Sequence, residues 1–249
     1  MKNLLTDLRN STFYISSYTF PVRKKFVIIL FVVIAVTLAA LWTFESRSAS
    51  RKQAESDFKI GYLYEKGIGV PLDPAEAFKW YKKAADAGLA EAQYNLGVLY
   101  YNGIGVKRDH TEALNWFLKA AKQGIPEAQF NSANAFRSGD GTDRDYVKAK
   151  DWYLKAARQG YAPAQFNLAA LHENGEGTSQ DYGEAFKWLL LADKFGYPPA
   201  SKYLQTFAPD LKPEQRIRIG EEADRIYSSI PKPVVPRSIT GSVLDMVQR

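Results

Sequence analysis

The sequence contains no cysteine and only two histidines. Without cysteine the chain has no disulfide and no thiolate metal ligand, so its fold must be stable without a covalent cross-link. The histidines, His110 and His172, lack the paired spacing of a typical zinc site. We therefore expect neither a metal nor a cofactor. From their positions, we expect His110 to be exposed to solvent and His172 to replace an aromatic packing residue.

Motifs for nucleotide binding and catalysis are also missing. The Gly67-x-Gly69 and Gly103-x-Gly105 turns have part of the glycine spacing of a phosphate-binding loop. Each turn, however, lies between two predicted helices, without a preceding strand and without a following Lys-Ser or Lys-Thr pair. Since no nucleophile and base stand in a spacing typical of catalysis, we predict that the chain is not an enzyme.

Basic charge is sparse outside the amino-terminal flank, although the net charge is +6. Residues 1–25 hold five basic side chains and one acidic side chain. The segment that contains the repeats described below is close to neutral and has no basic stripe of the kind that nucleic acid requires. We therefore predict no nucleic-acid partner and expect the basic flank to meet anionic lipid.

Charge is absent altogether from residues 26–44, FVIILFVVIAVTLAALWTF. As a helix this stretch spans roughly 28 Å, which is about the hydrocarbon core of a bilayer. We predict one transmembrane helix that stays uncleaved. The alternative is a cleaved signal peptide, with a weak small-residue site around Ser48-Ala49-Ser50. Basic residues at 23–25 are undiluted by acidic ones, which favours a cytoplasmic amino terminus and a periplasmic or lumenal carboxyl-terminal part.

Four tryptophans recur at a constant interval of 36 residues: Trp80, Trp116, Trp152 and Trp188. A fixed period of roughly 20 to 50 residues indicates a solenoid of stacked repeats. We expect the tryptophans to fill the space between repeats. Small residues also recur in one column, which allows helices to approach closely: Gly61, Gly97, Ala133 and Ala169.

The second repeat, residues 90–124, shows the unit most clearly. Apolar residues at helical spacing predict a first helix from Glu91 to Tyr101, and the glycines that follow end it. Asp109 is predicted to cap a second helix, and Glu112 three residues later completes a capping box. Each repeat is therefore a helical hairpin that needs its neighbours to bury its apolar faces.

The pattern A-x-A-x-Y/F-N-L-G-x-x-Y-x-x-G-x-G-V, followed by D-x-x-E-A-x-x-W-x-x-K-A-A-x-x-G, resembles the Sel-one-like repeat family, relatives of the tetratricopeptide repeats. Residues 90–124 match nearly throughout, and the resemblance covers about residues 51–205. The third repeat departs from it at Asp140, which replaces an apolar residue between two glycines. The resemblance implies a scaffold that binds proteins. Some cysteine-rich members have been linked to β-lactam binding or hydrolysis. Because this chain has no cysteine, we do not extend that activity to it.

The predicted fold is an all-α solenoid of tandem helix-turn-helix repeats, preceded by one transmembrane helix. We divide the chain into a basic tail without clear structure, the membrane helix, the repeat domain with a carboxyl-terminal capping helix, and a proline-containing tail. Their respective ranges are 1–25, 26–44, 51–230 and 231–249.

The first helices of successive hairpins are expected to line a concave groove, as in related tetratricopeptide arrays. The candidate protein-binding residues are Tyr94, Val98, Tyr101, Phe130, Asn134, Arg137, Phe166, Ala170 and Glu173. For the aromatic column at 94, 130 and 166, a simple core role is an equal alternative. We expect the neighbouring column, Asn95, Asn131 and Asn167, to bond backbone groups within the hairpin; the alternative is that it holds the backbone of a ligand in the groove.

Three functions remain open on the sequence alone. The first is a membrane-anchored adaptor that binds a protein partner through the groove. The second is an accessory structural subunit of a larger membrane complex, docked through the two tails. The third is a cell-wall-binding protein or a hydrolase.

Overall fold

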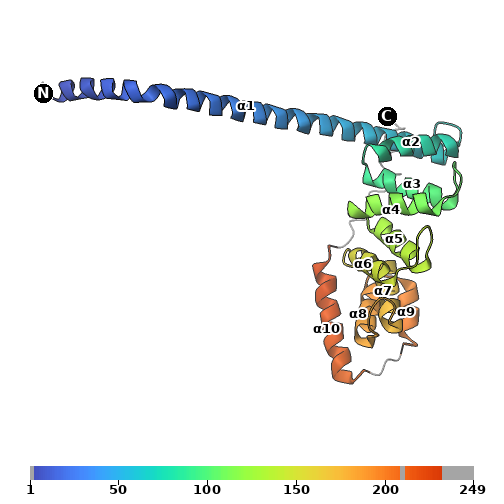
Figure 1. Cartoon of the computed structure of the whole chain (residues 1–249). Helices are drawn as coiled ribbons and strands as arrows, with labels where there is room; N and C mark the ends of the chain where they lie inside the picture. Colours follow the sequence, from blue (N-terminus) through green and yellow to red (C-terminus); the bar gives the residue numbers. More distant parts are fainter. Residues whose placement is uncertain (1–2, 208–210, 232–249) are drawn as a thin grey trace. The chain divides into compact units, whose positions relative to one another are not determined.

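The computed structural model describes residues 3–207 and 211–231, with side chains from residue 32 onward. All regular structure in these ranges is helical (Figure 1). The ten helices are α1 (Asn3–Lys66), α2 (Pro74–Asp86), α3 (Ala90–Asn102), α4 (His110–Lys122), α5 (Pro126–Ser138), α6 (Tyr146–Ala157), α7 (Ala162–Asn174), α8 (Tyr182–Lys194), α9 (Pro198–Leu204) and α10 (Pro213–Ser229). The chain divides into two compact units, residues 1–52 and 53–249.

The amino-terminal unit is formed by helix α1 up to residue 52, and this helix differs from the loose tail expected before residue 21. The backbone is helical from Asn3 onward and continues through Pro21. No glycine or proline lies between residues 3 and 20 to interrupt it. Within the described side chains, the stretch Val32–Lys66 is long and apolar enough to cross a membrane, a composition that a signal sequence shares. The apolar residues between Val32 and Phe44 are exposed (Trp42 by 71%), which is unlike a buried core helix, whereas Ala54 and Phe58 further along join the core of the repeats.

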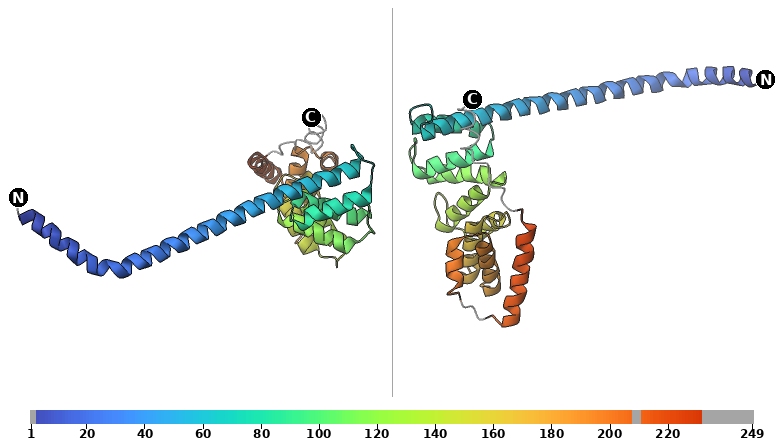
Figure 2. Two further views of the ribbon diagram at one scale, coloured as in Figure 1. Left: turned by 90° about the horizontal axis from the view of Figure 1, so that it is seen from above. Right: turned by 180° about the vertical axis from the view of Figure 1, so that it is seen from behind.

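The second unit is a stack of antiparallel helical hairpins, as predicted (Figures 1 and 2). The end of α1, from residue 53, packs against α2 as the first hairpin. Helices α3 and α4 form the second hairpin, α5 and α6 the third, and α7 and α8 the fourth. The second helix of each hairpin packs against the first helix of the following one. Helix α10 lies against α8 at the end of the stack. The buried apolar residues form clusters that each combine helices of neighbouring hairpins, and the two largest range from Ala54 to Trp116 and from Leu114 to Ala223.

The second helices begin at the predicted aspartate caps, but their capping differs in detail. The side chain of Asp109 accepts a hydrogen bond from the backbone N–H of Glu112 at 3.0 Å. The backbone N–H of Asp109 donates to the carbonyl oxygen of Tyr100 at 3.0 Å, so no reciprocal bond from Glu112 forms. The same carbonyl contact occurs at the other three caps, Asp73, Asp145 and Asp181. The prediction of a full capping box is wrong, because the loop returns to the carboxyl end of the first helix.

From the second hairpin onward, the second glycine of each loop is required by contact with the previous hairpin. Gly141 has φ of 73°, and a Cβ built there would lie 2.3 Å from the carbonyl oxygen of His110. Gly105 stands in the same relation to Pro74. Each loop therefore rests directly on the amino-terminal end of the second helix one hairpin back.

The most deeply buried large column is the residue after each tryptophan. Its members are at most 4% exposed: Tyr81, Phe117, Tyr153 and Leu189. Trp116 and Trp188 are buried as expected, but Trp80 and Trp152 are only half-buried. The small-residue column faces these rings, since a Cβ on Gly97 would lie 2.6 Å from the Phe117 ring.

Candidate protein-binding groove

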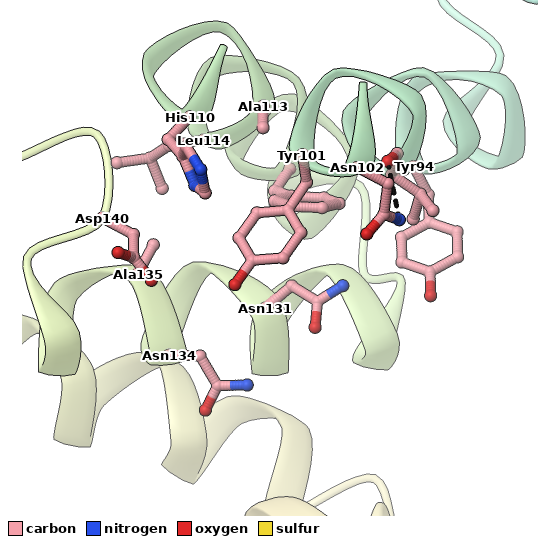
Figure 3. A pocket seen from close by; sticks show the side chains of 12 residues that line it. Tyr94, Tyr101, Asn102, His110, Ala113, Leu114, Asn131, Asn134, Ala135 and Asp140 are labelled. Atoms are coloured by element: carbon pink, nitrogen blue, oxygen red, sulfur yellow. Dashed lines mark hydrogen bonds between the residues drawn. The ribbon is translucent and has the colours of Figure 1, made fainter. Parts of the chain in front are cut away.

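A pocket of about 370 Å³ opens between the second and third hairpins (Figure 3). Helices α3, α4 and α5 form its walls, together with the loop after α5. The residues with polar or aromatic side chains that line it are Tyr94, Tyr101, Asn102, His110, Phe117, Asn131, Asn134 and Asp140. Apolar walls with a few polar groups, at this volume, are typical of ligand-binding cavities.

Four of the nine candidate groove residues meet in this pocket: Tyr94, Val98, Tyr101 and Asn134. The first three lie on successive turns of α3, and Asn134 lines the pocket from α5. Tyr101 is 42% exposed, so its ring is accessible from solvent. Arg137 is exposed on the last turn of α5 and is not among the lining residues.

The aromatic candidates of the later repeats pack between hairpins. The ring centroid of Phe130 lies 5.8 Å from that of Tyr153 and 5.3 Å from that of Tyr161. Phe166 packs in the same way against Tyr197, at 5.5 Å. Both rings join the hydrophobic core, in line with the alternative core role. Tyr94 combines the two roles, because it contacts Phe117 at 6.0 Å and also lines the pocket.

The remaining two candidates lie on α7. Ala170 is half-buried. The carboxylate of Glu173 accepts a hydrogen bond from the Tyr203 hydroxyl at 2.7 Å. This hydrogen bond, with burial and the negative charge of Glu173, raises the pKa of Tyr203 above its ordinary value. Glu173 therefore contributes to the packing of α9 against α7.

The asparagine column bonds tyrosine side chains, and the expectation of backbone partners is wrong. Asn167 Nδ2 donates to the Tyr153 hydroxyl at 3.2 Å. This contact links the second helix of one hairpin to the first helix of the next. At the pocket the equivalent of Tyr153 is Phe117, which has no hydroxyl.

Burial raises the pKa of Tyr94 and Tyr153, with desolvation of the phenolate as the main cause. Both hydroxyls therefore remain protonated at neutral pH. The Tyr153 hydroxyl donates to Asn134 Oδ1, which also accepts from Asn167 Nδ2 at 3.4 Å. Because both contacts reach the same oxygen, they orient the Asn134 side chain within the pocket wall.

Sequence reasoning missed two pocket residues. His110, expected to be exposed, is half-buried, and its ring lies 4.8 Å from that of Tyr101 in an edge-on arrangement. Its Nδ1 is buried and has no hydrogen-bond partner among the described residues. The other is Asp140, whose only signal in the sequence is its departure from the repeat pattern. Both positions become pocket walls because the third hairpin's loop rests on the start of α4.

Within the described residues, no group of three or more His, Cys, Asp and Glu side chains is arranged to hold a metal ion. The lining residues of the pocket contain one carboxylate and no lysine or arginine. The arrangement is thus a shaped surface of rings and amides with one negative charge. Such a surface is suited to recognising a side chain or a short extended segment.

Stacked two-helix hairpins with a 36-residue period and a cavity between first helices define a helical-repeat protein of the tetratricopeptide type. The Sel1 repeat family model matches four successive segments, residues 54–89, 90–125, 126–161 and 162–192. The chain therefore belongs to the Sel1 repeat family. Proteins of this fold generally mediate interactions between proteins and are typically non-catalytic.

The chain is also similar to two solved structures and to part of one curated protein. A Sel1 repeat protein from Oxalobacter formigenes is 32% identical, with a TM-score of 0.59, over 78% of this chain and 87% of that one. The protective antigen c5321 of uropathogenic Escherichia coli, described as displaying an SLR fold, is 28% identical with a TM-score of 0.44, over 80% of this chain and 55% of that one. Chitin synthase regulatory factor 3 of Schizosaccharomyces pombe is 38% identical over 50 residues, which is 20% of this chain but only 5% of that protein.

Proposed function

We propose that the chain is a membrane-anchored adaptor that binds a protein partner on the surface formed by the first helices of its repeats. The observation that carries this proposal is the pocket between the second and third hairpins. Four of the candidate groove residues, from two first helices, line it. Its rings and amides provide the aromatic and polar anchors that dominate protein interfaces.

The anchor is proposed to be the apolar part of α1. The uncharged run at residues 26–44 has the length of a bilayer core, and its described apolar side chains are exposed. The basic residues before it favour an amino terminus in the cytoplasm and repeats in the periplasm or a lumen. Protease added to intact spheroplasts or microsomes measures this topology. If the repeats are periplasmic, the protease digests them in intact spheroplasts, without lysis. Repeats that are digested only after the protease reaches the cytoplasmic side would reverse the assignment.

The adaptor role is tested by affinity purification of the full chain in mild detergent. A triple variant, with alanine at Tyr101, Asn134 and Arg137, should lose the partner that the wild-type chain retains. The matched control carries three changes at exposed positions of the second helices, Asn115, Lys122 and Asp151. Both variants should keep the helical circular dichroism of the wild type. Identical partner recovery from the wild type and the groove variant would refute binding at this surface.

The second candidate is an accessory subunit of a larger membrane complex. It is favoured by the apolar residues near the carboxyl end, Val243, Leu244, Met246 and Val247, which lie outside the described residues. A chain that ends at residue 231 separates the two candidates. If the complex is lost while the groove still binds its partner, the tail is the docking arm and the subunit role is correct.

A further inference from the structure

Asp140 occupies a loop position that needs no carboxylate. The equivalent residues of the first two repeats are Ile68 and Ile104, between the same pair of glycines. The backbone N–H of Asp140 donates to the Ala135 carbonyl at 3.0 Å, and that of Ile104 donates to the Leu99 carbonyl at 3.0 Å. Because the loop conformation is the same with isoleucine, the negative charge is not required for folding.

The carboxylate instead lies at the wall of the pocket. Figure 3 shows Asp140 and His110 toward one end, Tyr94 toward the other, and Tyr101 between them. One oxygen of Asp140 accepts from the Ser138 hydroxyl at 2.7 Å. No lysine or arginine stands among the lining residues to neutralise it, in a chain that contains 33 of these residues. A half-buried carboxylate in this setting favours a cationic ligand.

The remaining walls suit the stem and head of a basic side chain. Tyr94, Tyr101 and Phe117 present aromatic rings, which attract cations to their faces and pack against methylene groups. Val98 and Leu114 add aliphatic surface. Elsewhere in this protein the same preference is visible, since Lys119 Nζ lies 3.4 Å from the Trp116 ring centroid and Lys155 Nζ lies 3.8 Å from that of Trp152.

The junction at the pocket differs from its neighbours at one side chain. At the following junction the Tyr153 hydroxyl accepts from Asn167, and at the preceding one the Tyr81 hydroxyl donates to Glu65. Phe117 has no hydroxyl to make a polar contact, and its ring lines the pocket together with Asn131.

We propose that this pocket receives a lysine or arginine side chain of the partner, with Asp140 as the counter-charge and the rings of Tyr101 and Phe117 as walls. This inference rests on the proposed adaptor function and adds the chemistry of the residue that the partner inserts. The groove recognises a basic anchor in an extended segment.

The experiment uses the full chain in nanodiscs and a surface array of random dodecapeptides. The wild-type chain should select peptides that share one lysine or arginine. Replacing that residue by norleucine should weaken binding to the wild type at least tenfold. The variant Asp140→Ile, which restores the residue of the earlier repeats, should bind the basic peptide at least tenfold more weakly and should not distinguish it from its norleucine analogue.

A charge reversal gives an independent readout. The variant Asp140→Lys should lose the basic peptide and gain affinity for the same peptide with glutamate at the anchor position. Peptides that bind the wild type without a shared basic residue, and equally well to Asp140→Ile, would overturn the basic anchor and leave the adaptor function standing. If no peptide binds and the triple groove variant also retains every partner in the pull-down, the adaptor function fails as well.

Discussion

Trp116 and Trp80 occupy the same repeat position, but their environments differ. Trp116 on α4 is 7% exposed, whereas Trp80 on α2 is half-buried. We expect Trp116→Ala to lower the free energy of unfolding by ~3–5 kcal/mol, as loss of a buried tryptophan usually does. The matched change Trp80→Ala should cost well under half as much. Urea unfolding of both full-length variants, followed by circular dichroism, measures the difference, and equal losses would contradict the burial described here.

His172 gives a pH dependence whose sign follows from its pKa. Burial lowers this pKa from 6.5, and the positive charges of Lys150 and Lys187 act in the same direction, against Glu184 and Asp181. Below pH 6.5 the unfolded chain therefore binds a proton that the folded chain does not. Stability should fall as pH drops from 7 through 6.5 toward the folded-state pKa.

The variant His172→Phe, which copies Phe136 at the equivalent position of the third repeat, tests this directly. Its thermal midpoint should decrease less between pH 7 and pH 5 than the thermal midpoint of the wild type does. An unchanged pH profile would show that His172 keeps its ordinary pKa in the folded chain.

At the scale of the helix, the caps should depend on aspartate and not on the following glutamate. Asp109→Ala should cost ~0.5–2 kcal/mol because the side chain satisfies the N–H of residue 112. Glu112→Ala should cost less, since its carboxylate makes no reciprocal bond to the backbone of Asp109, which donates to Tyr100. Thermal unfolding measures the stability of both variants. An equal loss of stability would indicate that the full capping box forms.

The loops offer a second comparison between matched glycines. Gly141 and Gly124 both have positive φ, so alanine is strained at either position. A Cβ at Gly141 would also strike the His110 carbonyl, while a Cβ at Gly124 meets nothing within 4 Å. Gly141→Ala should therefore destabilise the chain by at least ~1 kcal/mol more than Gly124→Ala. Similar unfolding midpoints would mean that the loop does not rest on α4.

The hairpins were predictable because their signals are local. Periodic apolar residues, aspartate caps and terminal glycines act within one repeat, and the structure confirms the helices that they predict. The pocket was only partly predictable, since it depends on contacts between repeats. Its walls come from three helices of two hairpins, and its charge comes from a loop that rests on the previous hairpin. The burial of His110 has the same cause, which residue type and spacing do not reveal.

At the scale of the whole molecule, we propose that an apolar helix anchors a repeat array whose first helices contact a partner. The apolar stretch and the array belong to separate compact units. Mutations in the groove should therefore leave membrane association unchanged, and changes in the apolar helix should leave the hairpins folded.

The most direct test of the central claim is site-specific photo-crosslinking in native membranes. A photoreactive amino acid at Tyr101 or Asn134 should give one discrete adduct with a partner protein. The same group at Asn115 or Lys122, exposed on α4, should give none. Equal adducts from both sets of positions, or no adduct from the groove, would contradict a partner bound along the first helices.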